Sequence, residues 1–149
     1  MRVGIIQSNY IPWKGYFDFI DCVDLFIFHD DIQYTKGDWR NRNKIKTRNG
    51  TKWLTVPVHY RHKDQLICDT EIDYSTDWQN YHLNQLTENY AKAPHFEIII
   101  GLMREAFFHP ETYLTDLNTK LITSICKYLG ITTRLAWSTD YGLTGHKTE

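Results

Sequence analysis

Cysteine is scarce in this chain, and the few cysteines present form no recognisable pair. Cys22, Cys68 and Cys126 are the only three among 149 residues, and no CxxC spacing occurs. An odd number without that spacing argues against a disulfide framework or a zinc knuckle and favours a reducing compartment. Each cysteine lies in or beside an apolar stretch, so we expect all three to be buried small hydrophobic residues.

Long apolar runs and a strong charge of either sign are also missing. No apolar run approaches the length of a membrane span, and the N-terminus lacks the apolar region of a signal peptide. The formal net charge is −1, so nonspecific attraction to nucleic acid or to an anionic membrane is not expected. We therefore predict a cytoplasmic protein with no membrane span and no nucleic-acid partner.

Several motifs of known chemistry are absent as well. The only glycines near the first loop are Gly4 and Gly15, which excludes a GxGxxG or P-loop phosphate cradle. No Gly-x-Ser-x-Gly elbow occurs, so classical acyl hydrolysis has no support. His59 and His62 have a spacing that suits a metal, but no cysteine or carboxylate cluster supports them. We predict no metal site, and the residues indicate no particular cofactor.

Aromatic side chains are what the chain has in excess. They make up 15% of the residues, with ten tyrosines and five tryptophans. Such side chains fill a core, stack on sugar or base faces, or form a surface for a partner, and composition does not choose among these. The length of 149 residues and the 42% hydrophobic content are ordinary for one globular domain, which we place at residues 1–149.

The first thirty residues have the pattern of a βαβ unit. Val3–Gln7 and Leu25–Phe28 are short apolar runs typical of buried strands, and Lys14–Val23 between them has helical periodicity. Strand, helix and strand over this length indicate two parallel strands joined by a crossover helix. We expect these two strands to be neighbours in one sheet.

The rest of the chain indicates a hairpin, three helices and a returning strand. Asn49-Gly50 between two strand-like runs is a strong hairpin signal. Apolar stripes of helical spacing begin at Trp78, Phe96 and Leu114, and Gly130 ends the last of them. Ile131–Trp137 alternates like a strand. The predicted fold class is α/β, with a mostly parallel, Rossmann-like sheet, a β-hairpin and flanking helices.

The loop after the first strand is one candidate for ligand binding. In doubly wound folds, ligands approach the ends of the strands and the starts of the helices at this position. A rigid loop packed by a tryptophan is the alternative. The candidate side chains in this loop are Gln7, Asn9, Tyr10 and Trp13.

A second candidate cluster follows the second strand. Asp30 and Asp31 suit a general base or an acceptor of hydroxyl hydrogen bonds. Trp39, Arg40, Arg42 and Asn43 then bring an aromatic ring, two forked donors and a carboxamide. If this segment is an extended strand, the two arginines share one face and form an anion clamp, with Asn41 and Asn43 on the other face. A solvated turn followed by an edge strand is the alternative.

His82 completes the candidate chemistry. It lies on the aromatic face of its predicted helix, where it is either a core histidine with satisfied hydrogen bonds or a general acid or base. With Asp30 or Asp31 it forms the only acid–base pair that the sequence offers. Asn118 lies beside an apolar stripe, where a local core hydrogen bond or a functional role would explain it.

Together these residues resemble the WbqC-like protein family. The resemblance covers essentially the whole chain. Its specific stretches are Ile5–Phe17, Phe28–Tyr34, Trp39–Lys46 and Trp53–Val58, and His82, Tyr90–Pro94, Leu117-Asn118 and Tyr128–Ile131 also match.

The family is associated with gene clusters for O-antigen and other surface polysaccharides. The resemblance implies a transferase that moves an amino acid, such as glycine, or an acyl group to a sugar or nucleotide-sugar. A non-catalytic sugar-binding or scaffold protein of the same pathway is the alternative, and a nucleotide-handling enzyme is a third. Whether the chain is an enzyme stays open on the residues alone.

Two departures from the family pattern bear on the site. Many members have His-Gln-Pro where this chain has Ile6-Gln7-Ser8, so no role for that histidine carries over. Members also usually continue well past Glu149. We therefore expect a short form with an open pocket, or a homodimer whose polar tail, residues 140–149, contacts the Gln7–Trp13 loop of a second copy.

Overall fold

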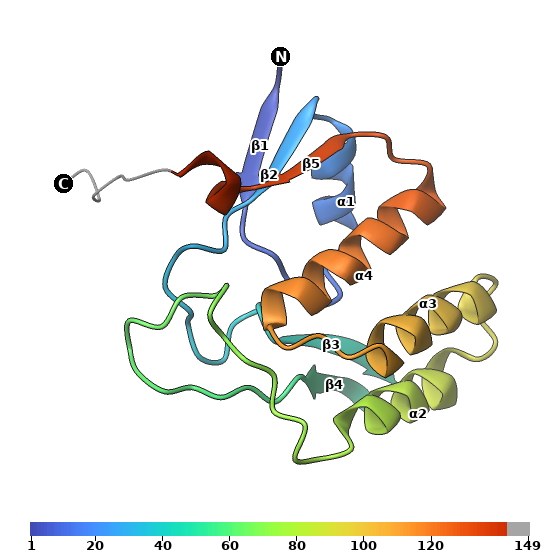
Figure 1. The fold of residues 1–149 in the computed structure, drawn as a ribbon. Coiled ribbons are helices and arrows are strands. Elements are labelled where there is room, and N and C mark those ends of the chain that lie inside the picture. Colours follow the sequence, from blue (N-terminus) through green and yellow to red (C-terminus); the bar gives the residue numbers. More distant parts are fainter. Residues whose placement is uncertain (143–149) are drawn as a thin grey trace.

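The computed structural model describes residues 1–142, and its central feature is a small parallel sheet (Figure 1). Strands β1 (Val3–Ile6), β2 (Leu25–Phe28) and β5 (Arg134–Trp137) pair in the order β1-β2-β5, and both pairings are parallel. Helix α1 (Lys14–Asp21) connects the first two strands. The predicted βαβ opening and the α/β fold class are confirmed.

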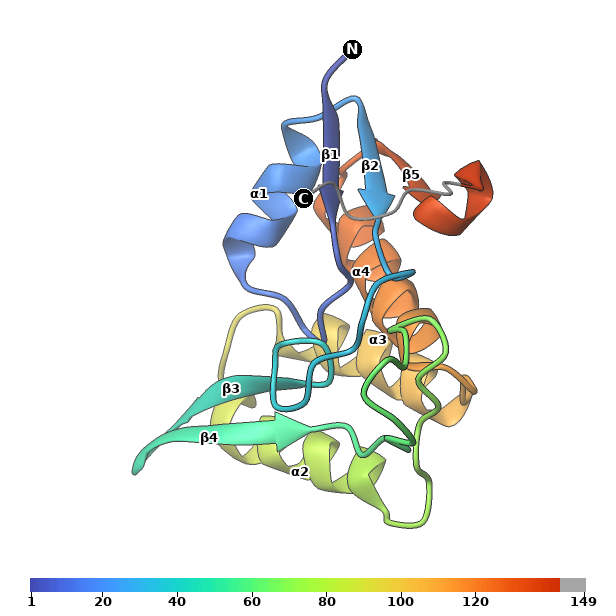
Figure 2. The ribbon, with the colours of Figure 1, turned by 90° about the vertical axis from the view of Figure 1, so that its left-hand side faces the viewer.

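Helix α1 and helix α4 (Leu114–Leu129) both pack on one face of this sheet (Figures 1 and 2). Phe26 and Phe28 of β2 are fully buried beneath them. On the opposite face, Val3 is 43% and Ile5 is 56% exposed. Parallel sheets usually have helices on both faces, and in residues 1–142 only one face of this sheet has them.

An antiparallel hairpin forms the second sheet. Strands β3 (Arg42–Thr47) and β4 (Gly50–Thr55) are joined by Arg48 and Asn49, and Thr47 pairs with Gly50. Gly50 has a φ of 115°, a conformation that only glycine adopts without strain. The hairpin predicted from Asn49-Gly50 is therefore confirmed.

Helices α2 (Trp78–Tyr90) and α3 (Phe96–Phe108) pack with the hairpin and with α4 around a second core. Helix α4 contributes to both cores, because Leu117 and Leu121 belong to the second core and Ile122 faces the parallel sheet. The long α4 thus joins the two sheets. None of the helices in residues 1–142 is long and apolar enough to cross a membrane.

The cysteine prediction holds only for Cys126, since Cys22 is exposed and Cys68 is half-buried. Three further details differ from the sequence prediction. The stripe of helical spacing that begins at Trp78 places Tyr81 on the predicted buried face of α2 and leaves Leu83 off it. In the structure Leu83 is buried and Tyr81 is 45% exposed, because α2 contacts both α3 and β3. Strand β5 begins only at Arg134, because Arg134 pairs with Leu25, the first residue of β2; the Thr133 hydroxyl before it donates to the carbonyls of Ile20 and Val23.

The third difference is the segment from Thr70 to Tyr74, whose alternating residues predict a short strand. It forms only isolated bridges, in which Ile72 pairs with Val58 and Glu71 pairs with Tyr113. At the end of the chain, a short 3-10 turn, η1 (Ser138–Tyr141), follows β5. The predicted polar tail lies mostly outside the described residues.

Candidate functional site

The carboxyl ends of β1 and β2 converge on a buried carboxylate. Asp30, which follows β2, is 3% exposed. Its Oδ1 accepts a hydrogen bond from the Ser8 backbone N–H at 2.8 Å, and its Oδ2 accepts one from the Thr115 hydroxyl in the first turn of α4. A buried charge is stable only when such donors compensate it. Asp30 therefore ties the first loop to the start of α4.

A second set of contacts extends this polar cluster to the turn before β3. The Arg40 guanidinium donates to Asn9 Oδ1 and lies 3.6 Å from the Asp38 carboxylate. The Asn118 amide donates to the Arg40 carbonyl at 2.8 Å and to Ser8 Oγ at 3.3 Å. Asn118 is fully buried, so its core hydrogen bonds, one of the two predicted explanations, are observed.

The strand expected to place both arginines on one face does not include Arg40, so the anion clamp stays a prediction without that geometric basis. Arg40 lies in a turn, before the strand begins at Arg42. The Arg42 guanidinium stacks on the Trp53 ring, with its central carbon 4.2 Å from the ring centroid, and donates to the Gly37 carbonyl. Side chains alternate across a strand only inside that strand, and Arg40 is outside it.

The side-chain amides of the two asparagines are also bonded to the protein backbone. The Asn41 amide donates to the Val56 carbonyl at 2.9 Å. The Asn43 amide donates to the carbonyls of Tyr10 and Ile11, the former at 3.3 Å. Both amides therefore hold neighbouring segments in place, and a ligand role for Asn43 stays a prediction.

His82 occupies a buried position at the centre of the second core. Its Nδ1 lies 2.7 Å from the Tyr10 hydroxyl, and both side chains are at most 1% exposed. Burial lowers the pKa of His82 to about 4, against the opposing effect of a hydrogen bond to the Thr55 backbone. Burial likewise raises the pKa of Tyr10 well above its usual value. The neutral histidine therefore accepts from the tyrosine hydroxyl.

This geometry matches the core alternative for His82. In the described part of the chain, no hydrogen bond or ion pair joins His82 to Asp30 or Asp31. Asp31 instead accepts from the Ser138 hydroxyl and lies 3.1 Å from His29 Nδ1, at the ends of β2 and β5. A catalytic role for His82 remains a prediction that no contact supports.

A cavity of about 210 Å³ opens beside Asp30, between β2, β5 and the start of α4. Asp116 lines it too, and burial, followed by the charges of Glu111 and Asp30, raises the pKa of the Asp116 carboxyl. The lining also includes Cys68, Tyr113, Thr115, Trp137, Ser138 and Thr139.

Sequence reasoning found Asp30 but missed the other residues of this cavity. Asp116 stands in the first turn of a helix, where acidic residues are ordinary, so its position carried no signal. Cys68 reaches the cavity because its backbone N–H donates to the Asp30 carbonyl at 2.9 Å, and burial raises the pKa of its thiol to about 11. Only the rule that ligands bind at the carboxyl ends of parallel strands predicted a site at this edge of the sheet.

Of the remaining predicted residues, Trp13 and Trp39 are exposed and Gln7 is half-buried. Trp13 is 68% exposed, and its ring lies over Gly15, where any Cβ would clash with it. Trp39 is 45% exposed and lies 5.3 Å from Trp53, centroid to centroid. Gln7 is half-buried, and its carbonyl accepts from the Tyr16 hydroxyl at 2.9 Å. These side chains stay ligand candidates, and none of them lines the Asp30 cavity.

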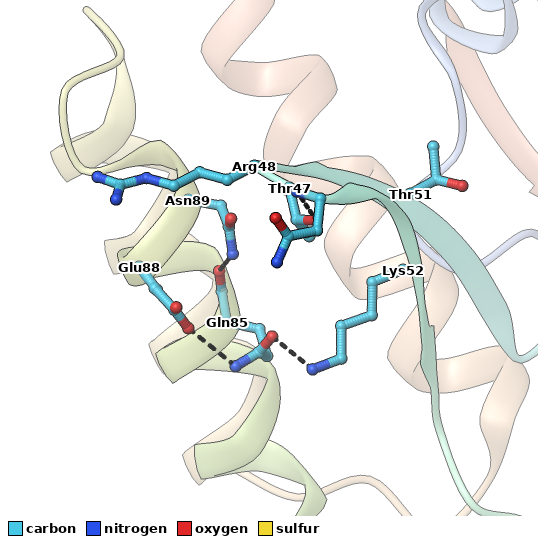
Figure 3. Close-up of a pocket in the computed structure, with 8 residues that line it drawn as sticks. Thr47, Arg48, Thr51, Lys52, Gln85, Glu88 and Asn89 are labelled. Atoms are coloured by element: carbon cyan, nitrogen blue, oxygen red, sulfur yellow. Dashed lines mark hydrogen bonds between the residues drawn. The ribbon is translucent and has the colours of Figure 1, made fainter.

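A larger, polar cavity of about 530 Å³ lies between the tip of the hairpin and α2 (Figure 3). Lys52 donates to Gln85 Oε1 at 2.8 Å, and the Gln85 amide donates to Glu88 at 3.2 Å. These groups are already paired with each other, and no predicted site residue lines this cavity. Within residues 1–142, no cluster of three or more histidine, cysteine or acidic side chains is placed to hold a metal.

Comparison with known proteins gives the chain its family. The model of the WbqC-like protein family matches residues 7–149. The chain is also 51% identical over 150 residues to "Uncharacterized protein Rv1507c" of Mycobacterium tuberculosis (strain ATCC 25618 / H37Rv). That match covers 99% of this chain and 64% of the relative, so the chain spans about two thirds of the relative's length. No solved structure matches the chain. The chain belongs to the WbqC-like protein family.

Proposed function

We propose that the chain binds a sugar or the sugar part of a nucleotide-sugar in the synthesis of surface polysaccharides such as O-antigen. The observation that carries this proposal is the Asp30 carboxylate, which is buried at the strand ends beside a cavity. Carboxylates accept hydrogen bonds from sugar hydroxyls or from an amino group. The predicted cytoplasmic location of the chain is consistent with a ligand that is a sugar activated by a nucleotide.

The size and charge of the cavity favour the sugar over the nucleotide. Pockets for drug-sized ligands measure about 300–1,000 Å³, so a cavity of about 210 Å³ suits one sugar ring. Among residues 1–142, no lysine or arginine lines it, and Asp30 and Asp116 would repel a phosphate. The Trp137 ring, 38% exposed, offers an apolar face to a sugar ring.

Transferase activity is the second candidate, and Asp116 favours it. Transfer of an amino acid or acyl group to a sugar requires a base that takes the proton from the attacking hydroxyl or amine. A carboxyl whose pKa is raised by burial and by neighbouring carboxylates suits that role. In the non-catalytic alternative, the same residues bind and orient the sugar and no bond is made.

Calorimetry with a panel of sugars and nucleotide-sugars tests the proposal. We expect saturable binding, and we expect Asp116→Asn to weaken it by about ten-fold because a charged hydrogen-bond acceptor is lost. Glu88→Gln, in the polar cavity near the hairpin, is the matched control and should bind as the unmodified chain does.

The same variants separate the two candidates. Loss of turnover in Asp116→Asn beyond its loss of affinity would support the transferase, whereas binding without turnover in the unmodified chain would leave the binding protein. Absence of heat with every sugar and nucleotide-sugar, or equal affinity in both variants, would reject the site.

A further inference from the structure

A second cavity continues from the Asp30 cavity along α4. It measures about 380 Å³. The two cavities share two lining residues, Asp116 in the first turn of α4 and Trp137 at the end of β5. A ligand held beside Asp30 can therefore extend past these two side chains into the second cavity.

Polar side chains dominate the lining of the second cavity. Trp137 is the one large apolar side chain that residues 1–142 contribute to it. An acyl chain would therefore have little apolar surface to contact, whereas hydroxyl groups, which both donate and accept, suit a ligand that is itself rich in hydroxyls. The hydroxyl-bearing residues of the lining are all on α4, namely Thr119, Thr123 and Ser124.

The charges of the second cavity favour a neutral ligand over a phosphate. Lys120 is the only cation that residues 1–142 place in the lining. It already donates to Glu111 Oε1 at 2.8 Å and to the His109 carbonyl at 3.0 Å. Asp116 adds a second carboxyl to that of Glu111, so the acidic groups outnumber the cation and would repel a phosphate.

Trp137 gives the two cavities a common apolar face. Its ring packs against Phe28, with the ring centroids 5.7 Å apart, and keeps 38% of its surface exposed. A sugar ring can lie with its C–H groups on such an indole while its hydroxyls bond to the polar side chains around it. The contact with Phe28 anchors the indole to the core of the parallel sheet.

We propose that the two cavities together bind two linked sugar rings, so that the ligand of this site is the end of an oligosaccharide. One ring lies beside Asp30, the next ring lies in the second cavity, and the linkage passes between Asp116 and Trp137. This inference rests on the proposed function, because it extends the same site by one sugar unit.

Calorimetry with matched monosaccharides and disaccharides tests the inference. The probes are glucose with maltose and cellobiose, and N-acetylglucosamine with diacetylchitobiose. The disaccharide that binds best should bind about ten-fold more tightly than its monosaccharide, which is the effect of about two further hydrogen bonds.

Thr123→Trp separates the second cavity from the first. Thr123 is exposed and lines the second cavity but not the Asp30 cavity, so an indole there should fill the second cavity without disturbing either core. The affinity for the disaccharide should fall to that for the monosaccharide, and the affinity for the monosaccharide should not change. Thr87→Trp, at an exposed position of α2 outside both cavities, is the matched control and should keep the preference for the disaccharide.

Three results would overturn the inference. The first is equal affinity for the monosaccharide and the disaccharide in the unmodified chain, which would leave the proposed function intact and limit the site to one ring. The second is an unchanged preference for the disaccharide in Thr123→Trp. The third is UDP-N-acetylglucosamine binding more tightly than any disaccharide and losing that advantage in Thr123→Trp, which would assign the second cavity to a nucleotide. Absence of binding by every sugar would instead reject the proposed function, and this inference with it.

Discussion

Most polar side chains singled out from the sequence hold segments of the fold together. Asp30 links the first loop to α4, Asn43 fixes the conformation of Ile11, and Asn118 joins α4 to the turn before β3. A cluster of such residues in a sequence indicates that the chain converges there. It does not distinguish a carboxamide that holds the backbone from one that meets a ligand, because both uses need the same atoms.

At the scale of single residues, His82 should make the stability of the fold depend on pH. Its pKa is about 4 in the folded chain and 6.5 for an ordinary histidine, so the unfolded chain binds more protons between these values. Stability should therefore fall as the pH drops from 6.5 towards 4, by up to about 3 kcal/mol from this residue. Urea unfolding at pH 7 and pH 4.5 measures the loss, and His82→Gln should show a smaller one.

A surface histidine provides the control for that measurement. His62 is exposed, so His62→Gln should keep the pH dependence of the unmodified chain. An equal loss of stability on acidification in His82→Gln and in the unmodified protein would show that His82 is not a buried neutral base.

At the scale of elements, local signals in the sequence were sufficient for most strands and helices. The βαβ opening, the hairpin at Asn49-Gly50 and the end of α4 at Gly130 all form as predicted. Failures occurred where a tertiary contact decides the outcome. Strand β5 begins where its partner β2 begins, more than a hundred residues earlier in the chain, and Arg40 lies in a turn, where it contacts Asn9 and Asn118.

At the scale of elements, replacing two helix-associated glycines by alanine should change the stability of the fold in opposite directions. Gly130 ends α4 with a φ of 74°, so Gly130→Ala should destabilise the fold by about 1–2 kcal/mol. Gly101 lies inside α3, and a Cβ there would meet open space. Gly101→Ala should therefore stabilise the fold by about 0.5–1 kcal/mol. Thermal unfolding of both variants checks the pair, and a change of the same sign in both would contradict it.

At the scale of the molecule, α4 is the element that makes the two cores one structure. It carries Thr115 and Asn118 to partners 85 and 110 residues earlier in the chain. Periodicity located this helix and its apolar stripe, but no local pattern says which loop a helix will meet. The sequence therefore predicted Asp30 but not the other residues that line the cavity beside it. The predicted homodimer remains a prediction, and its proposed contact lies mostly outside the described residues.

The central claim is that a sugar binds at the carboxyl end of the parallel sheet, beside Asp30. Amide NMR during titration with the nucleotide-sugar that binds best in calorimetry tests it most directly. We predict that the shifted amides belong to residues at the cavity, led by Cys68, Thr115 and Ser138, and that those at the hairpin tip do not move. Shifts confined to the hairpin tip and α2, or no shifts at saturating ligand, would contradict this claim.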